Sequence, residues 1–176
     1  MKKIINLLTI ACVIACTAMA INAQTNPGPN PGLGWMFPDK AKNQTVFQVQ
    51  EREISNPGPK ITLNASQAVP ETGTAATPED IMFTIQIASP DRYKYPDSIA
   101  MKVKIDGKAI PDIKISPLDK RMEGKNYLET LGTRMNYDVF RAIANAKSVE
   151  FKVDGMVITV GADKLANFAY LVKTIG

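Results

Sequence analysis

Two segments in the middle of the chain alternate apolar and polar residues with the period of a β-strand. In residues 81–88 every second position is isoleucine or phenylalanine, and residues 99–105 repeat the pattern with lysines between the apolar positions. This period is typical of strands that bury one face. Weaker patterns predict further strands at 45–54, 61–63, 110–115 and 128–135.

The last forty residues predict helices as well as strands. Asn136 precedes a helical pattern over 137–146 and is a good helix cap, and a second helical pattern begins near Asp163. Its expected apolar stripe is Leu165, Phe168, Ala169 and Val172. Between the two helices, residues 148–153 and 156–160 predict a hairpin.

Two Asp-Gly pairs mark tight turns. Asp106-Gly107 and Asp154-Gly155 each follow a short strand pattern, and this dipeptide tolerates the positive φ angles of a two-residue hairpin turn. Segments 67–79 and 117–126 contain proline and glycine, and the second is also strongly charged. We expect both segments to be loops.

These elements predict an α+β fold in which an antiparallel β-sheet packs against two C-terminal helices. We assign residues 41–176 to a single domain. Residues 24–40 repeat proline and glycine and predict a flexible segment before that domain.

Residues 1–23 have the pattern of a secretory signal peptide. Lys2 and Lys3 precede an apolar stretch that ends in small residues, and cleavage after Ala23 would leave Gln24 as the new N-terminus. A second interpretation places a lipidated cysteine at Cys16, because residues 13–16 resemble a lipoprotein signal. We therefore expect export to the periplasm or medium, with membrane attachment only if Cys16 is lipidated.

Composition excludes several kinds of chemistry. The 176 residues include no histidine, and their two cysteines, Cys12 and Cys16, lie within the predicted signal. A histidine-based catalytic triad and the usual zinc ligands are therefore excluded from the mature chain. The net charge of +4 is too small to indicate a nucleic-acid partner, and no nucleotide-binding motif is present. We expect no cofactor and no metal.

The segment 90–97 is the most suggestive candidate for recognition. Arg92, Tyr93 and Tyr95 lie between two prolines, and tyrosine and arginine are favoured in contact surfaces. In an extended loop Tyr93 and Tyr95 would project to the same side. The alternative is a strand connection whose tyrosines lean on the sheet.

Trp35 and Phe37 form a second candidate contact at the end of the proline-rich segment. They either fold back onto the domain or remain exposed as an apolar anchor for a partner.

Two pairs of carboxylates could support acid–base chemistry. Glu51 and Glu53 share a strand face, and Asp91 and Asp97 share a loop. Nothing in the sequence makes either pair converge.

The C-terminal section resembles a tail of uncharacterised exported bacterial proteins. The likeness rests on the runs 127–131, 137–140 and 143–150 and covers about fifty residues, with a strand, a helix, a hairpin and a closing helix. It implies no activity. The leading hypothesis is a non-enzymatic binding or interaction module with a protein, peptide or glycan partner. The alternatives are a small hydrolase or lyase that uses carboxylate and tyrosine groups, and a structural component of the envelope.

Overall fold

The computed structural model describes residues 24–25, 34–52, 59–70, 77–90, 94–95 and 97–176. Within them the chain forms eleven strands and two helices. The strands are β1 (Gln24–Thr25), β2 (Gly34–Asp39), β3 (Gln44–Arg52), β4 (Lys60–Pro70), β5 (Asp80–Ser89), β6 (Ile99–Ile105), β7 (Lys108–Ala109), β8 (Ile113–Glu123), β9 (Asn126–Asn136), β10 (Ser148–Val153) and β11 (Met156–Gly161). The helices are α1 (Tyr137–Ala144) and α2 (Ala162–Ile175).

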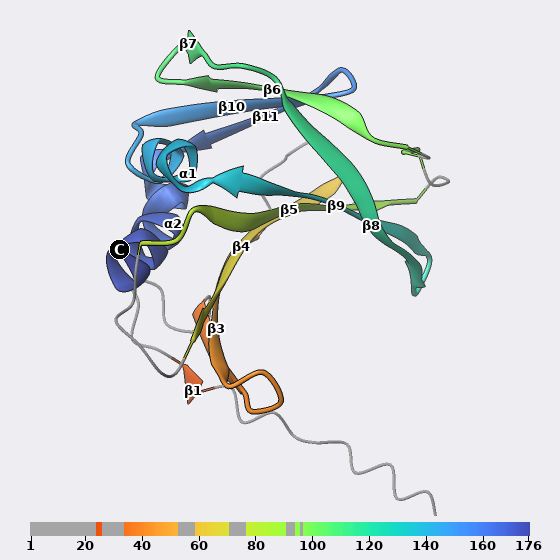
Figure 1. Ribbon diagram of the computed structural model, residues 1–176. Coiled ribbons are helices and arrows are strands. Elements are labelled where there is room, and N and C mark those ends of the chain that lie inside the picture. Colours follow the sequence, from red (N-terminus) through yellow and green to blue (C-terminus); the bar gives the residue numbers. More distant parts are fainter. Residues whose placement is uncertain (1–23, 26–33, 53–58, 71–76, 91–93, 96) are drawn as a thin grey trace, which may run out of the picture.

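The strands form one continuous antiparallel sheet that bends back over itself (Figure 1). Its order is β1-β2-β3-β4-β5-β9-β8-β6-β10-β11, and β7 adds to β6. Strand β8 causes the bend, because residues 113–115 pair with β6 whereas residues 116–123 pair with β9. A register shift between Pro117 and Asp119 accompanies the change of partner. The expected α+β class with an antiparallel sheet and two helices is confirmed.

A chain of four phenylalanines joins the two halves of the sheet to both helices. Phe83 of β5 stacks on Phe151 of β10 with ring centroids 5.5 Å apart, and Phe168 of α2 meets the edge of Phe83 at 6.1 Å. Phe140 of α1 lies 5.5 Å from Phe168. All four side chains are fully buried. The core therefore lies between the two halves of the sheet, and the helices close one side of it.

Each helix buries the face that its sequence pattern predicts, with small differences. The side chain of Asn136 accepts hydrogen bonds from the backbone N–H groups of Asp138 and Val139, which confirms the predicted cap. In α2, Leu165 and Phe168 are buried but Val172 is only half-buried. Leu171 and Ile175 complete the buried stripe instead.

Both predicted Asp-Gly turns are present. Asp106 and Gly107 have φ angles of 49° and 79°, and Asp154 and Gly155 have 44° and 83°. Positive φ at both central positions is the geometry of a type I′ hairpin turn.

Three segments differ from the loops and linker expected from sequence. Residues 34–39, placed in the flexible segment, form β2 and pair with β3. The expected loop at 67–79 is strand as far as Pro70. The charged segment 117–126 forms most of a hairpin between β8 and β9, which turns at Gly124 with a φ of 62°. The charged residues of this hairpin are exposed on both faces, so no apolar period reveals it. The predicted signal peptide 1–23 lies outside the described residues.

Candidate functional site

One face of the sheet is turned away from the core and is lined by uncharged polar side chains. Burial alternates along the whole of β5 and over residues 60–66 of β4, so the odd-numbered apolar residues there face the core and the even-numbered residues face outward. We call this outward side of β3, β4, β5 and β9 the open face. Its half-buried polar residues are Gln48, Gln50, Thr62, Asn64, Ser66, Thr84, Gln86 and Thr130.

Strand register places these residues in rows that run across the sheet. Gln50, Asn64 and Thr84 form one row, and the next row contains Thr62, Gln86 and Thr130. Cross-strand hydrogen bonds hold two of the amides. Asn64 Nδ2 donates to Thr84 Oγ1 at 3.3 Å, and Gln86 Nε2 donates to Thr130 Oγ1 at 3.5 Å. The amide groups of the open face are thus oriented by their neighbours.

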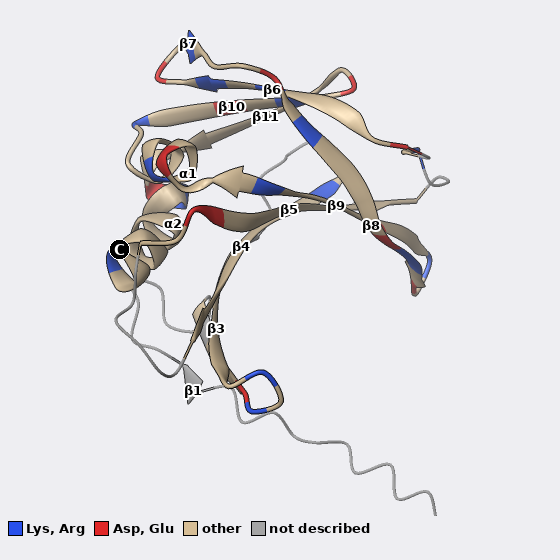
Figure 2. Ribbon diagram, viewed as in Figure 1, with Lys and Arg blue, Asp and Glu red and all other residues tan. Residues whose placement is uncertain are grey.

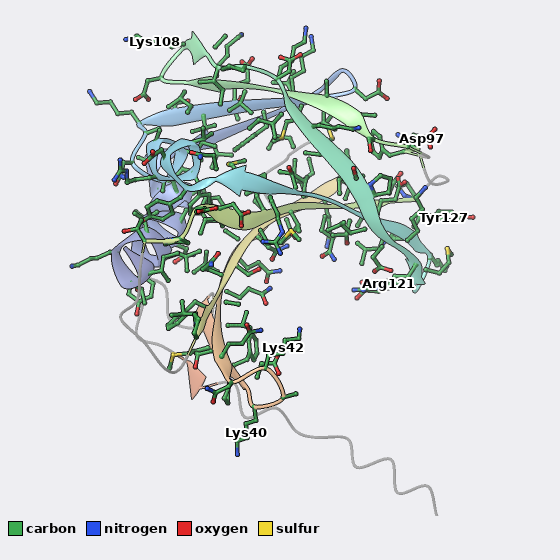
Figure 3. All side chains as sticks on the ribbon, in the orientation of Figure 1. Lys40, Lys42, Asp97, Lys108, Arg121 and Tyr127 are labelled. Carbon is green, nitrogen blue, oxygen red and sulfur yellow. The ribbon has the colours of Figure 1, made fainter. Side chains whose placement is uncertain are left out.

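The open face is the inner side of an arch. In Figure 1, β3 descends at one end of the arch and the β8–β9 hairpin descends at the other, with β4, β5 and β9 between them. Arg121 on the hairpin points toward the inside of the arch, and Tyr127 points away from it (Figure 3). A curved sheet of this kind offers a concave surface on which side chains from four strands converge.

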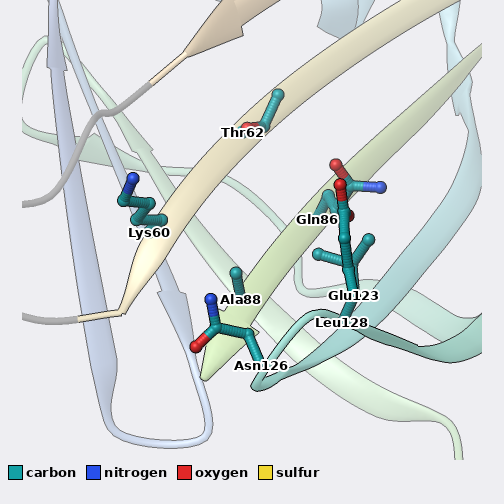
Figure 4. Close-up of a pocket in the computed structure, with 7 residues that line it drawn as sticks. All are labelled: Lys60, Thr62, Gln86, Ala88, Glu123, Asn126 and Leu128. Carbon is teal, nitrogen blue, oxygen red and sulfur yellow. The ribbon is translucent and has the colours of Figure 1, made fainter. Parts of the chain in front are cut away.

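A hollow of about 260 Å³ lies at one end of the open face (Figure 4). Thr62, Gln86 and Leu128 form its floor, and Lys60 and Glu123 place one charge of each sign at its border. The complete lining is Lys60, Thr62, Gln86, Ala88, Glu123, Asn126 and Leu128.

Two further hollows continue from this one around the end of β5. A hollow of about 390 Å³ shares Lys60, Ala88 and Asn126 with the first. A third, of about 300 Å³, shares Ser89 and Lys94 with the second. Together they form a groove from the open face to the end of the core.

Glu129 is the most deeply buried charged residue at the far end of this groove. Its side chain is 2 % exposed, and its two carboxylate oxygens accept hydrogen bonds from the backbone N–H groups of Lys94 at 2.8 Å and Tyr95 at 3.1 Å. The carboxylate therefore fixes the chain that follows β5 against β9.

Tyr95 is buried by this anchor, as in the alternative in which the tyrosines of this segment lean on the sheet. Its side chain is only 5 % exposed, and it belongs to the core. Burial raises the pKa of the Tyr95 hydroxyl, and the nearby carboxylates of Asp154 and Glu129 raise it further. Arg92 and Tyr93, the other two candidates in this segment, lie outside the described residues.

The Trp35 and Phe37 segment is part of the sheet. Trp35 pairs with Gln48 and Phe37 with Val46, and this register places Phe37 on the same side of the sheet as the open face. The Phe37 side chain is half-buried.

The two carboxylate pairs suggested by the sequence are not brought together by the described residues. Glu53 and Asp91 lie outside them, and Asp97 is exposed (Figure 3). The carboxylates that do share a hollow are Glu129 and Asp154. Sequence reasoning missed them because they are 25 positions apart, Glu129 within β9 and Asp154 in the turn between β10 and β11. The outward polar positions of β5, in contrast, are the second half of its alternation.

The described part of the chain contains no group of three or more acidic, histidine or cysteine side chains that could hold a metal ion. Its helices are too short to cross a membrane.

Comparison with protein-family models, curated proteins and solved structures gives no match.

Proposed function

We propose that this chain is an exported, non-enzymatic binding module whose binding surface is the open face and the groove that continues from it. One observation carries the proposal: three adjacent strands present uncharged hydrogen-bonding side chains on a concave surface without a covering element among the described residues. Surfaces that hold a few oriented polar groups in a hollow are suited to ligand recognition.

Export rests on the N-terminal pattern. The basic and apolar segment 1–23 supports a cleaved signal peptide, and Cys16 supports the alternative of a lipid anchor. We place the binding module in the periplasm, at the cell surface or in the medium. The resemblance of the C-terminal section to exported bacterial proteins agrees with this location.

A second candidate function, a small hydrolase or lyase, is favoured by the hollow that contains Tyr95, Glu129 and Asp154. Its weakness is Glu129, because both carboxylate oxygens already accept backbone hydrogen bonds. Such an arrangement is typical of a structural anchor. Turnover of chromogenic ester or glycoside substrates, lost in Tyr95→Phe and retained in Tyr127→Phe, would favour the enzyme instead.

The binding surface can be tested with isolated cell envelopes from the producing bacterium. The purified protein should sediment with the envelopes, and the double variant Gln86→Ala, Thr130→Ala should remain in solution. Gln67→Ala is the matched control, because Gln67 is also a half-buried glutamine of this sheet but faces the opposite side, in register with Phe47.

The melting temperatures of all variants should stay close to that of the wild type, since half-buried surface substitutions cost little stability. Equal sedimentation of the double variant and the wild type would show that the open face is not the binding surface.

A further inference from the structure

We infer that the ligand of the open face is a neutral glycan chain. This inference rests on the proposed function and adds the chemical class of the ligand. It follows from three observations. The described side chains at the centre of the face carry no charge, and they combine amides and hydroxyls with apolar groups. The backbone N–H and C=O groups beneath them are already paired.

The centre of the open face, formed by β4 and β5, carries no charged residue. After Lys60, β4 has no charged residue, and β5 has none after Asp80 (Figure 2). Two arginines at the border of the face, Arg134 and Arg121, are each paired with an aspartate. Arg134 Nη1 lies 2.9 Å from Asp80 Oδ1, and Arg121 Nη1 lies 2.8 Å from Asp119 Oδ2. An uncharged polar ligand is therefore complementary to the centre of the face, whereas an anionic polymer would find no unpaired row of cations there.

The polar groups match the hydroxyl groups of a sugar. An amide offers a donor and an acceptor side by side, and a threonine hydroxyl can act as either, so a pair such as Gln86 and Thr130 can bond neighbouring hydroxyls of one ring. Adjacent strands are about 4.8 Å apart, so the row from Gln50 through Asn64 and Thr84 to Gly132 spans about 15 Å. This length suits a short oligosaccharide.

Apolar side chains lie between these polar groups. Leu118, in the irregular part of β8, is 53 % exposed and covers Gly132, where a Cβ atom would collide with the leucine side chain. Met82 and Leu128 occupy the same face on β5 and β9. The C–H surface of a sugar ring can pack against such groups while its hydroxyls reach the amides.

The backbone argues against an extended peptide as the ligand. Peptides that bind to sheets usually add a strand to a free edge and use main-chain hydrogen bonds. Strands β4, β5 and β9 are each paired on both sides, so their N–H and C=O groups are already used. Recognition at the open face must come from side chains alone.

Asn64 supports a ligand that donates hydrogen bonds. Its Oδ1 atom is buried and has no hydrogen-bond partner among the described residues, although its Nδ2 atom donates to Thr84 Oγ1. A buried acceptor without a partner is costly. Rotation of this amide toward a sugar hydroxyl would restore the missing bond.

The inference can be tested by calorimetric titration of the full, isolated protein with defined hexasaccharides. The probes are maltohexaose, cellohexaose, xylohexaose and mannohexaose, with hexagalacturonate as the anionic control and hexaglycine as the peptide control. At least one neutral probe should bind, with an affinity that changes little between low and high salt.

Gln86→Ala and the near-isosteric Thr130→Val should each weaken binding about 10-fold, as expected for the loss of one or two hydrogen bonds. Gln67→Ala should bind like the wild type.

The outcomes separate this inference from the proposed function. Binding of hexagalacturonate or hexaglycine in place of the neutral probes would overturn it. To cover a glycan absent from the panel, envelopes are treated with periodate, which cleaves vicinal diols, or with protease. Loss of envelope binding after periodate alone supports the glycan. Loss after protease alone overturns the glycan but leaves the binding module intact. No envelope binding under any condition rejects both.

Discussion

Four buried phenylalanines hold the layers of this molecule together. Phe83 and Phe151 come from the two halves of the sheet, and Phe140 and Phe168 come from the two helices. Because the four rings contact one another in sequence, removal of one leaves a cavity bounded by elements from different parts of the chain.

Phe140→Ala and Phe168→Ala should each lower the free energy of unfolding by about 3–5 kcal/mol, the usual range for a buried aromatic ring. Urea denaturation followed by circular dichroism measures this loss. Val172→Ala is the control, because Val172 lies in the same helix as Phe168 but is half-buried, and its loss should be clearly smaller. A loss below about 1 kcal/mol for both phenylalanine variants would contradict the packing described.

The buried Tyr95 should make the free energy of unfolding fall at alkaline pH. Its pKa in the folded protein is raised above 10.0 by burial and by Asp154 and Glu129. The neutral hydroxyl is thus favoured by folding. Its contribution to stability is fully present below pH 10 and is lost as pH rises through the folded pKa, because the unfolded chain ionises first.

Melting temperatures of wild type and Tyr95→Phe, measured from pH 8 to pH 11, test this effect. The wild type should lose stability above pH 10 more steeply than the variant, since phenylalanine cannot ionise. All other residues are the same in both proteins, so their effects cancel in the comparison. Parallel curves would mean that Tyr95 is not shielded from water as described.

At the scale of elements, two hairpins with the same turn have different surroundings. Asp106 and Asp154 both have positive φ in Asp-Gly turns. Asp106 Oδ1 also accepts hydrogen bonds from the backbone N–H groups of Lys147 and Ser148, each at 2.9 Å. It therefore ties the β6–β7 turn to the start of β10.

Asp106→Ala should lower the free energy of unfolding by about 1–3 kcal/mol more than Asp154→Ala, because both changes place alanine at positive φ but only the first leaves two N–H groups without their acceptor. Asp106→Asn should recover most of the difference, since its amide oxygen can accept the same bonds. Chemical denaturation of the three variants gives the comparison. Equal losses for the two alanine variants would show that these hydrogen bonds contribute nothing.

The β8–β9 hairpin borders the open face but contributes little to the core at its distal end. Its distal charged residues are exposed on both faces, and its Arg121 projects toward the inside of the arch. Because β8 changes partner from β6 to β9, the position of this hairpin depends on the bend of the whole sheet.

At the scale of the whole molecule, the N-terminus expected after processing is the first residue of strand β1. Gln24 would be the first residue after cleavage at Ala23, and it begins β1, where it pairs with Met36. We expect the protein isolated from its producing cells to have the intact mass of residues 24–176, without cysteine. Mass spectrometry decides this directly. A diacylglycerol adduct on Cys16 would instead show a membrane-anchored lipoprotein.

Local patterns in the sequence were sufficient for β5, β6, the β10–β11 hairpin, both helices and both Asp-Gly turns. Period-two alternation marks β5 and β6 because one side of each is buried, and Asn136 caps α1 through contacts two and three residues away. These features are decided by neighbours in sequence. The outward polar residues of β5 follow from the same alternation.

The burial of Glu129 and Tyr95 and the formation of the open face depend on the tertiary structure. The order of the strands brings β9 between β5 and β8, and this placement buries Glu129 beside the backbone of Lys94 and Tyr95. Tyr95 therefore lies in the core, although its local sequence is typical of an exposed loop. The open face likewise requires the register of β3, β4, β5 and β9, because residues more than forty positions apart, such as Gln86 and Thr130, become neighbours only through strand pairing. Long-range pairing of this kind leaves no periodic signal in the chain, because the alternation within a strand depends only on which of its own faces is buried.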